Sequence, residues 1–412
     1  MKTLSRIFAV SASILWASAA YADKEPIVFA SLQDITKAYT FVMIEAVQGQ
    51  QDYIAAVNAD GGIDGHPVQL IVRDHGNEPQ RGIEAYNRAV GEGAVVVNIA
   101  SSPVSGALIT RVEEDKIPMI TQSVGRPEAS DGSVFHYSFP AGPTHWSQVA
   151  ALLNHIKEHE GGLKGKKIAV VHIDHPGGRA MLTMPERLAP TEGFEVKGFG
   201  YPSPGTEQSA VWTEVRRMRP DFVILAGAGV GQPVSIREAV RNGFSPKQLL
   251  SVPWLAESDM EAVGTSTAIG IRRVEITVPG ADLPVIANIM DKVIKPGKGA
   301  GDEKNVGRTY YNFGAGSMAF VVEGARIALK EFGAPLTGEK MKKGLEMIKD
   351  FDANGLTPPF TITADDHQGG GYARISEWDG EKWVPRGDWT SSYQDIVWDE
   401  IKKASGAFKK GG

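Results

Sequence analysis

Eight short apolar runs, in two blocks of four, alternate with helix-like stretches along this chain. Each run is a near-continuous series of Val, Ile, Leu and Ala, for example "AVVVNIA" at 94–100 and "KIAVVHID" at 167–174. Such runs are typical of parallel strands covered by helices on both faces. The pattern predicts an α/β fold with two doubly wound, Rossmann-like lobes. The predicted strands lie at 27–32, 68–74, 94–100 and 117–123, and then at 167–174, 194–201, 222–228 and 249–254.

The last part of the chain carries too few strands to form a third lobe. We expect residues 278–370 to return to the first lobe, which begins with residues 27–140. Residues 371–392 are expected to cross again to the second lobe, 141–277. Two lobes joined by three crossings form a hinge with a cleft. The tail, 393–412, is predicted to be a solvated, weakly amphipathic helix.

The first 22 residues are expected to be a signal peptide. Lys2 and Arg6 precede an apolar stretch from Ile7 to Ala19, and Ala20-Tyr21-Ala22 is a small-x-small cleavage site. An apolar stretch of this length is too short to span a bilayer. We therefore expect cleavage after Ala22 and export from the cytoplasm, with an uncleaved N-terminal anchor as the alternative.

Charge and composition exclude several classes of function. The chain has a formal net charge of −6, and removal of residues 1–22 would take away two basic residues and no acid. An acidic exported protein is a poor candidate for binding nucleic acid. With no cysteine, it has no disulfide framework. No window after the signal peptide has the run of about 18 apolar residues that a membrane span needs.

Five motifs follow one another along nearly all of the mature chain. They are "VNADGGIDGHPVQLIVRDHGNEPQRGIEAYNRAV" (57–90), "IASSPVSGALITRVEEDKIPMITQS" (99–123), "GKKIAVVHIDHPGGRA" (165–180), "MRPDFVILAG" (218–227) and "VRNGF" (240–244). This ordered set resembles the leucine/isoleucine/valine-binding type I group of periplasmic solute-binding proteins of ABC importers. The resemblance implies a two-lobe receptor that binds a small polar molecule between its lobes and delivers it to a membrane permease.

Polar side chains follow two neighbouring apolar runs of the first lobe. Ligands of open α/β sheets sit beyond the carboxyl ends of the strands, and the free N–H groups of a helix start favour an anion. We expect these side chains to form a seat for a carboxylate or carbonyl group, as the resemblance also implies. For Ser102, a helix N-cap is the alternative role. The candidates are Ser101, Ser102, Thr121, Gln122 and Ser123.

Candidate residues of the second lobe also lie at the ends of predicted strands. Asp174 and His175 come at the end of the run that starts at residue 167. Gly227 ends another run, and its lack of a side chain would let the backbone approach a ligand. In the family that the chain resembles, an aromatic residue near Asp174 and His175 usually packs on the ligand. Here His175 is expected to take that place.

Aromatic and acidic residues near the predicted cleft decide which ligand suits it. Trp254 ends the last run of the second block, and Tyr39 follows the first run of the chain. Both are candidates for an aromatic wall against a flat or apolar ligand, with core packing as the alternative. Amino-acid binders of the resembled family place an acid near Trp254 to pair with the ligand's ammonium. Glu257, three residues further on, is the candidate for that role.

Two ligand classes therefore stay open. If Glu257 reaches the cleft, a branched-chain amino acid or amide fits. If Trp254 takes that place, a carboxylate without an amine fits better, such as an aromatic acid, and the sequence slightly favours this second class. The predicted function is an extracytoplasmic receptor that captures a small carboxylate-bearing ligand for an ABC importer permease.

Motifs for other chemistry are incomplete. "HIKEH" (155–159) places His155 and His159 on one helical face, as an inverted zinc motif does, but a third ligand is not evident. "GAGVG" (227–231) follows a strand, yet the next run ends in Trp254 rather than in the acid that a dinucleotide site needs. We therefore expect no metal, no cofactor and no enzymatic activity. The alternatives are an exported α/β hydrolase and the ligand-binding component of a sensory system.

Overall fold

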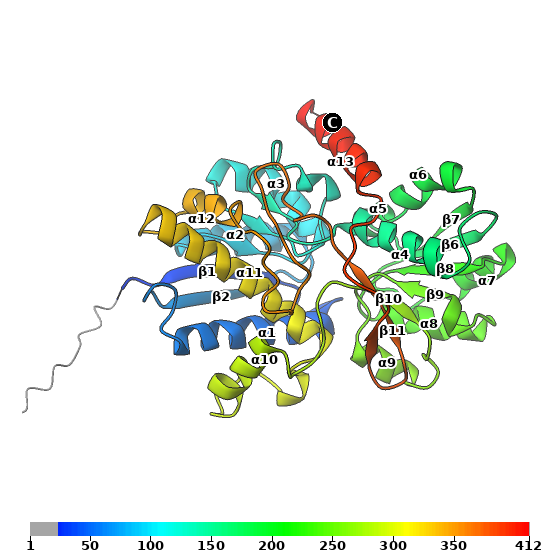
Figure 1. The fold of residues 1–412 in the computed structure, drawn as a ribbon, viewed down its shortest axis with the longest axis horizontal. Helices are drawn as coiled ribbons and strands as arrows, with labels where there is room; N and C mark the ends of the chain where they lie inside the picture. The colour runs from blue at the N-terminus through cyan, green and yellow to red at the C-terminus, as the bar shows by residue number, and fades with distance from the viewer. Residues whose placement is uncertain (1–23, 412) are drawn as a thin grey trace, which may run out of the picture.

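Two separate sheets dominate the computed structural model, which describes residues 24–411 (Figure 1). The predicted signal peptide lies outside the described residues. The first sheet has the strand order β2-β1-β3-β4-β5, and all of its pairs are parallel. Its strands are β1 (Ile27–Gln33), β2 (Val68–Asp74), β3 (Val97–Asn98), β4 (Met119–Ile120) and β5 (Ser138–Phe139).

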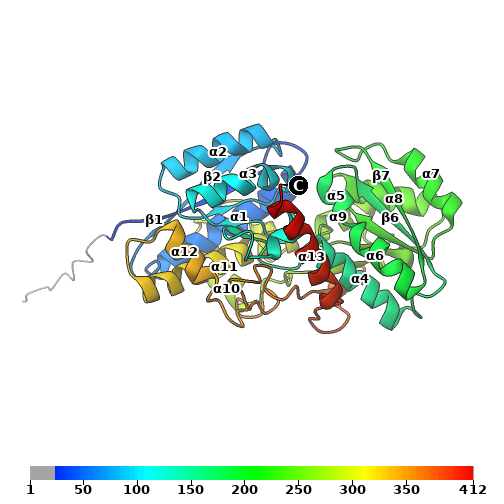
Figure 2. The same ribbon diagram turned by 90° about the horizontal axis from the view of Figure 1, so that it is seen from above.

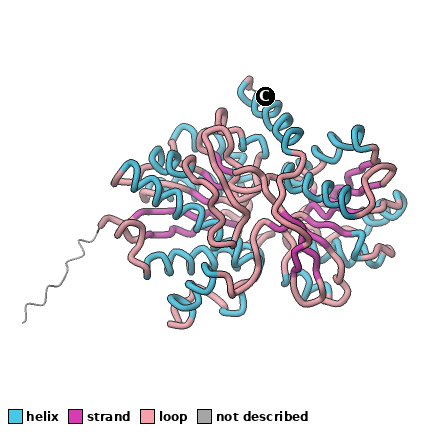
Figure 3. The backbone as a smooth tube through the Cα atoms, in the orientation of Figure 1, coloured by secondary structure: helices cyan, strands magenta, loops and turns pink. Residues whose placement is uncertain are grey.

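The second sheet has the order β12-β11-β10-β9-β8-β6-β7. It is parallel from β7 to β10, whereas β11 runs antiparallel to β10 and to β12. Figure 3 shows the strands of the two sheets as two separate groups. The predicted α/β fold with two parallel-rich sheets is confirmed. The strands are β6 (Lys167–Ile173), β7 (Glu195–Tyr201), β8 (Phe222–Ala226), β9 (Leu249–Ser251), β10 (Arg272–Glu275), β11 (Arg374–Trp378) and β12 (Trp383–Pro385).

Both faces of each sheet carry helices, which explains why central strands such as β6 and β8 are apolar along most of their length. In β6, Ile168 and Val170 face the core under α4 (His145–His159) and α6 (Thr183–Glu192). The alternate residues Ala169 and Val171 face a second core. That core lies under α7 (Ser209–Met218), α8 (Gly231–Arg241) and α9 (Glu257–Val263). A strand buried on both sides has no polar face to alternate with.

The first sheet is covered in the same way. On one face lie α1 (Thr40–Ala59), α11 (Thr309–Phe332) and α12 (Gly338–Leu345), and on the other α2 (Pro79–Gly91) and α3 (Ser102–Asp115). Helices α1 and α11 cross closely. A Cβ atom on Gly49 would lie 2.1 Å from the Tyr311 carbonyl oxygen, and one on Gly314 would lie 1.8 Å from that of Ala46. Glycine is therefore required at both positions by this crossing.

The chain passes between the two sheets three times. It leaves the first sheet after β5, returns after β10, and leaves again before β11. The returning segment contains α10 (Pro284–Ile289), which packs beside α1, together with α11 and α12. The exact limits of the two lobes stay predictions. No helix within residues 24–411 is long and apolar enough to cross a membrane.

The C-terminal helix α13 (Gln394–Lys409) is less solvated than expected from the sequence. Val397 and Ile401 are fully buried in a cluster with Trp146 and Met184 of the second lobe. Further along α13, Ser405 Oγ donates to the buried carboxylate of Asp131 (2.6 Å), which precedes β5 in the first lobe. Figure 2 shows α13 lying across the boundary between the two lobes. One face of this helix therefore contacts both lobes.

Candidate ligand-binding site

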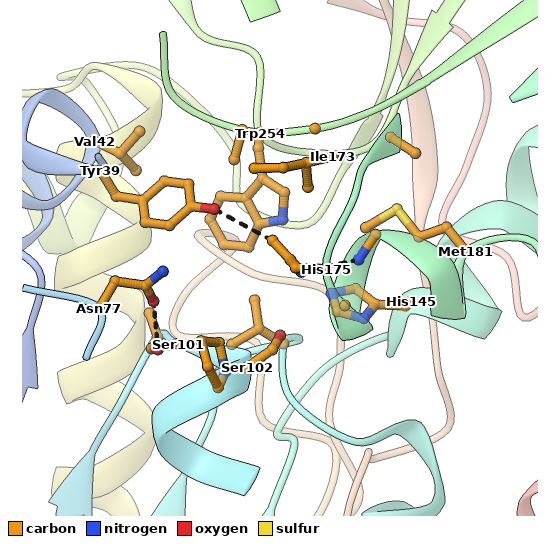
Figure 4. Close-up of a pocket in the computed structure, with 18 of the residues that line it drawn as sticks. Tyr39, Val42, Asn77, Ser101, Ser102, His145, Ile173, His175, Met181 and Trp254 are labelled. Atoms are coloured by element: carbon orange, nitrogen blue, oxygen red, sulfur yellow. Dashed lines mark hydrogen bonds between the residues drawn. The ribbon is translucent and has the colours of Figure 1, made fainter. Parts of the chain in front are cut away.

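A cavity of about 570 Å³, part of it open to solvent, lies between the two lobes at the carboxyl ends of their strands. Residues that follow β1, β2 and β3 meet residues that follow β6, β8 and β9 around it (Figure 4). The lining residues are Tyr39, Val42, Met43, Asn77, Ala100, Ser101, Ser102, Pro103, Val124, His145, Ile173, His175, Gly177, Gly178, Met181, Ala226, Gly227, Ala228 and Trp254.

Six of the residues predicted from the sequence line this cavity: Tyr39, Ser101, Ser102, His175, Gly227 and Trp254. They come from both lobes, as the cleft hypothesis requires. Their role in binding a ligand remains a prediction. In some of these residues, hydrogen bonds within the protein already occupy the polar groups. In others, the polar groups remain available to a ligand.

The two serines after β3 have different roles. Ser101 is the N-cap of α3, because its Oγ accepts the Val104 amide hydrogen (3.3 Å) and donates to Asn77 Oδ1 (2.7 Å). Ser102 Oγ accepts the Gly125 amide hydrogen (3.2 Å) and keeps its own proton for another acceptor. The Ser102 amide also belongs to the first turn of α3, whose N–H groups lack partners within the helix. Ser102 therefore offers donors to the cavity, and Ser101 is the cap.

Asn77 was not identified from the sequence. It follows β2 with φ of 58°, a left-handed conformation that asparagine tolerates better than most residues. Because its Oδ1 accepts from Ser101, its Nδ2 amide is the group left to donate into the cavity. The rule that pointed to Ser101, a polar residue just beyond the carboxyl end of a strand, also applies to Asn77 and would have found it.

Tyr39 and His175 meet across the cavity (Figure 4). The distance between Tyr39 Oη and His175 Nε2 is 3.4 Å, and His175 Nδ1 accepts the Gly178 amide hydrogen (3.2 Å). This second bond assigns the proton of the neutral ring to Nε2. Burial lowers the pKa of His175 and raises that of Tyr39 to about 12. Nε2–H therefore points at the phenol oxygen, and the Tyr39 proton is left for a ligand.

His145, the first residue of α4, was also missed. It is 3% exposed and lines the cavity, and its Nδ1 has no hydrogen-bond partner among the described residues. Burial lowers its pKa to about 4, so the ring is neutral near pH 7. A buried polar atom without a partner calls for an explanation, and a bound ligand would supply one. No motif in the sequence marks this residue, which follows the first crossing between lobes.

Apolar side chains complete the cavity. Trp254 is 6% exposed and packs edge-on against Phe313 of α11, with 5.1 Å between ring centroids. Gly227 is required by packing, because a Cβ atom there would lie 2.0 Å from Tyr201 Oη. A Cβ atom on Gly177 of the second lobe would lie 2.8 Å from Ser102 Oγ of the first lobe. The two lobes therefore approach closely between Gly177 and Ser102. The cavity thus combines an apolar wall with a seat of donors.

Five other predicted residues do not line this cavity. Thr121 Oγ1 donates to the Val124 carbonyl (2.8 Å), within its own turn. Gln122 and Ser123 have positive φ values of 49° and 66°, and they line a separate cavity of about 380 Å³ near the hinge. The turn that follows β4 thereby directs these two side chains away from the main cavity. Asp174 is exposed and pairs with Arg179 (2.5 Å).

Glu257 is the fifth of these residues. It belongs to the first turn of α9, and its carboxylate accepts hydrogen bonds from the Thr309 amide (3.0 Å) and the Thr309 hydroxyl (2.8 Å). The acid therefore caps the start of α11, where the helix dipole favours negative charge. It is three residues from Trp254 in the sequence, but this contact with α11 occupies both of its oxygens.

Charge is absent from the lining of the cavity. None of its lining residues is Asp, Glu, Lys or Arg. The polar groups that remain available are donors or neutral imidazoles: Ser102, Asn77, Tyr39 and His145. A site of this kind suits a ligand whose polar end accepts hydrogen bonds, and it contains no carboxylate that would pair with an ammonium group.

The zinc-like motif at 155–159 lies at the C-terminal end of α4. Within residues 24–411, no group of three or more His, Asp or Glu side chains is placed to hold a metal ion. At the zinc-like motif, Arg272 lies beside His155, with 3.5 Å between Arg272 Nη1 and His155 Nε2. A guanidinium at this distance occupies the side of the ring from which a cation would bind.

Comparisons with known proteins agree with this architecture. Leu/Ile/Val-binding protein homolog 3 of Brucella melitensis biotype 1 is 25% identical over 229 residues, which cover 55% of this chain and 60% of that protein. The match thus spans less than two thirds of the length of this curated relative. A solved structure described as that of an ABC transporter permease from the Pseudomonas fluorescens group is 34% identical, with a TM-score of 0.86. The alignment covers 94% of this chain and 97% of that one.

The fold is shared more widely than the sequence. A branched-chain amino acid ABC transporter structure from Thermus thermophilus, with bound valine, is 19% identical with a TM-score of 0.78. The alignment covers 93% of this chain and 99% of that one. The sequence profile described as periplasmic binding protein matches residues 26–382. Because this match covers most of the chain, the protein belongs to the periplasmic binding protein family, a family of binding proteins rather than of enzymes.

Proposed function

We propose that this protein is the extracytoplasmic receptor of an ABC importer and captures a small carboxylate-bearing ligand that has no amine. Its partner would be a membrane permease, and the signal peptide would direct export and be cleaved after Ala22. The names of the similar proteins support the transport role. The observation that carries the ligand class is the lining of the cavity, where uncharged hydrogen-bond donors converge and no acid lies among the lining residues.

The arrangement of donors supports a carboxylate bound between the lobes. Ser102 and Asn77 come from the first lobe, beside the start of α3, where an anion is favoured. His145 comes from α4 of the second lobe. A carboxylate accepts several hydrogen bonds at once, so one group can satisfy donors from both sides. Such a ligand makes its full set of contacts only when the lobes are together.

This geometry also supplies enough energy for lobe closure. A ligand moves a conformational equilibrium only through its preference for one state. A change from 1:99 to 99:1 in favour of the closed form needs about 5.5 kcal/mol of preference. Hydrogen bonds to a charged group contribute about 1.5–3 kcal/mol each. Only contacts that form on closure count, and for a ligand seated on the first lobe these are the contacts with the second. A hydrogen bond to His145, together with burial of the apolar part of the ligand against Trp254, Ile173 and Met181, reaches that order.

The apolar part of the ligand would lie against Trp254, Ile173 and Met181. A flat aromatic acid fits such a wall well, because a planar ring stacks on or meets an indole edge favourably. A branched-chain amino acid is the second candidate, favoured by the names of the similar proteins. Its ammonium would need acceptors, and Glu257 is engaged at the start of α11.

Matched ligand pairs test this choice. We would measure thermal shifts and calorimetric affinities for 4-methylpentanoate against leucine, and for 3-phenylpropanoate against phenylalanine. In each pair only the amine differs. The proposal expects the carboxylates to bind at least tenfold more tightly, because an ammonium buried without an acceptor is costly. Tighter binding of the amino acid in both pairs would overturn the ligand class while leaving the transport role in place.

A further inference from the structure

Trp254 lines the ligand cavity and packs against Phe313, so that the two rings form an aromatic pair with one residue from each lobe. Trp254 follows β9 of the second lobe, and Phe313 belongs to α11 of the first. Their planes meet at 90° with 5.1 Å between centroids, and each residue is 6% exposed. The Trp254 carbonyl accepts a hydrogen bond from Gln232 Nε2 (3.1 Å), which holds the backbone behind the indole. The two packed rings therefore form a partition between the lobes, and the hydrogen bond from Gln232 fixes the backbone of Trp254.

Two more cavities follow behind this partition. The nearer one, of about 260 Å³, shares Trp254 with the ligand cavity and is also lined by Phe313. The deeper one, of about 380 Å³, shares Phe313 and Ile276 with the nearer one and is also lined by Phe320. Because each cavity shares lining residues with the next, the three follow one another along the boundary between the lobes. The Trp254–Phe313 pair separates the first from the others.

The deeper cavity is suited to an apolar group that replaces water. Its lining is mainly apolar, with three phenylalanines among its residues. It also contains two buried acceptors without partners among the described residues, Gln122 Oε1 and Thr357 Oγ1. Buried polar atoms of this kind are usually satisfied by water. Poorly ordered water in an apolar cavity is favourable to displace.

We propose that the Trp254–Phe313 pair acts as a length gate that sets which members of the ligand class bind. The gate confines the apolar part of the ligand to the first cavity and excludes homologues whose tails would have to extend into the two cavities behind it. This inference rests on the proposed capture of carboxylates, and it adds a limit on ligand length. Trp254 is then a specificity-determining residue as well as an aromatic wall.

The test opens the gate from either side. Calorimetric affinities would be measured for benzoate, phenylacetate, 3-phenylpropanoate and 5-phenylpentanoate with the wild-type protein and with the Trp254→Ala and Phe313→Ala variants. In the wild type, affinity should fall at the long end of the series. In Trp254→Ala the order should reverse, with 5-phenylpentanoate gaining about tenfold over 3-phenylpropanoate, since its two further buried methylenes are worth about that factor.

Two controls separate a gate from a simple loss of packing. Trp254→Phe keeps a ring at the partition and should keep the wild-type length preference. Trp398→Ala removes a tryptophan of α13 that lines none of the three cavities and should also keep it. If Trp254→Ala does not fold, Phe313→Ala tests the same partition from the first lobe. An equal loss of affinity for every acid in the folded gate variant would overturn the proposal.

A parallel series of α-amino acids with the same tails distinguishes this inference from the proposed function. If the wild type prefers the amino acids, the ligand class is wrong, and the length preference is then read on the amino-acid series. If the preference for carboxylates holds but opening the gate leaves the length preference unchanged, only the gate is wrong. If the wild type and the gate variants bind neither the carboxylates nor the amino acids, both the proposed ligand class and the length gate are wrong.

Discussion

Tyr39 of the first lobe and His175 of the second meet across the ligand cavity, with 3.4 Å between the phenol oxygen and Nε2. Since His175 Nδ1 accepts from the Gly178 amide, the imidazole donates to Tyr39, and the phenol proton is free for a ligand. The Tyr39 hydroxyl of the first lobe is thus oriented as a hydrogen-bond donor by His175 of the second lobe. This donor is complete only when the two lobes are together.

Replacement of Tyr39 by Phe should weaken ligand binding by about tenfold to a hundredfold. The variant keeps the ring but loses a hydrogen bond to a charged acceptor, worth about 1.5–3 kcal/mol. The free energy of unfolding without ligand should change little. Calorimetry with the best carboxylate of the matched pairs checks this. Tyr53→Phe, which changes a partly buried tyrosine of α1 that does not line the cavity, serves as the control and should bind normally.

Ser101 and Ser102 should separate stability from binding. Ser101→Ala removes the N-cap of α3, which should lower the free energy of unfolding by about 1 kcal/mol. Ser102→Ala removes a hydroxyl that faces the ligand, and it should reduce affinity about tenfold with a smaller effect on stability. Urea unfolding and calorimetry on both variants give the comparison. Similar effects of the two substitutions on ligand affinity would contradict the distinct roles assigned to them.

Stability should fall as the pH drops below about 6.5, in part because of His145. Burial lowers the pKa of this residue to about 4 in the folded protein, whereas an exposed histidine titrates near 6.5. Between these values the unfolded chain binds a proton that the folded chain does not. The contribution of neutral His145 is therefore fully present above pH 6.5 and is lost as the pH falls towards 4.

The variant His145→Gln removes this titration. Its free energy of unfolding should depend less on pH between 6.5 and 4 than that of the wild type, by at most about 1.4 kcal/mol per pH unit. Urea unfolding at several pH values in this range measures the difference. His136→Gln, which changes an exposed histidine, serves as the matched control for the substitution. Identical slopes for the wild type and His145→Gln would show that His145 takes up its proton normally in the folded state.

Glu257→Gln should affect stability and not ligand preference. The carboxylate caps α11 through two contacts with Thr309, and loss of its charge at a helix start should cost about 1 kcal/mol. The preference between a carboxylate and its matched amino acid should stay as in the wild type. If Glu257 instead pairs with a ligand ammonium, the substitution would abolish binding of amino acids, which the same calorimetric pairs would reveal.

The contact between Ser405 and Asp131 should hold the C-terminal half of α13 on the first lobe. Both residues are buried, with 2.6 Å between the hydroxyl and the carboxylate. Ser405→Ala should therefore speed hydrogen exchange of the α13 amides by about tenfold, which corresponds to the loss of one buried hydrogen bond. The control is Lys403→Ala, which removes a lysine that pairs with Glu400 of the same helix and should leave exchange unchanged.

The order of strands and helices could be predicted because burial of a strand on both faces leaves a local mark in the sequence, a run of apolar residues. A strand such as β6 alternates between two cores, so it is apolar at every position from Ile168 to Val171, and the sequence displays this directly. The lengths of the central strands were less predictable. The run at 94–100 contains a strand of only two residues, Val97–Asn98, although Val95 and Ile99 still donate backbone hydrogen bonds to Val28 and Ile120 of the neighbouring strands.

The site was only partly predictable because strand ends do not fix the direction of side chains. Ser102 follows its strand into a helix and faces the cavity, whereas Gln122 enters a turn with positive φ and faces the hinge. Glu257 is close to Trp254 in sequence, yet one turn of α9 takes it to α11. His145 reaches the cavity from a helix that begins after a crossing between lobes. Such placements depend on tertiary contacts that no local pattern encodes.

The neutral lining of the cavity has a consequence for the conditions under which the protein would work. A site that holds an anion with lysine or arginine weakens as ionic strength rises, because mobile ions screen charge over about 10 Å at 0.1 M salt. Hydroxyl, amide and imidazole dipoles act over much shorter distances than that screening length. The affinity of such a receptor for its ligand would therefore depend little on the salt concentration around it.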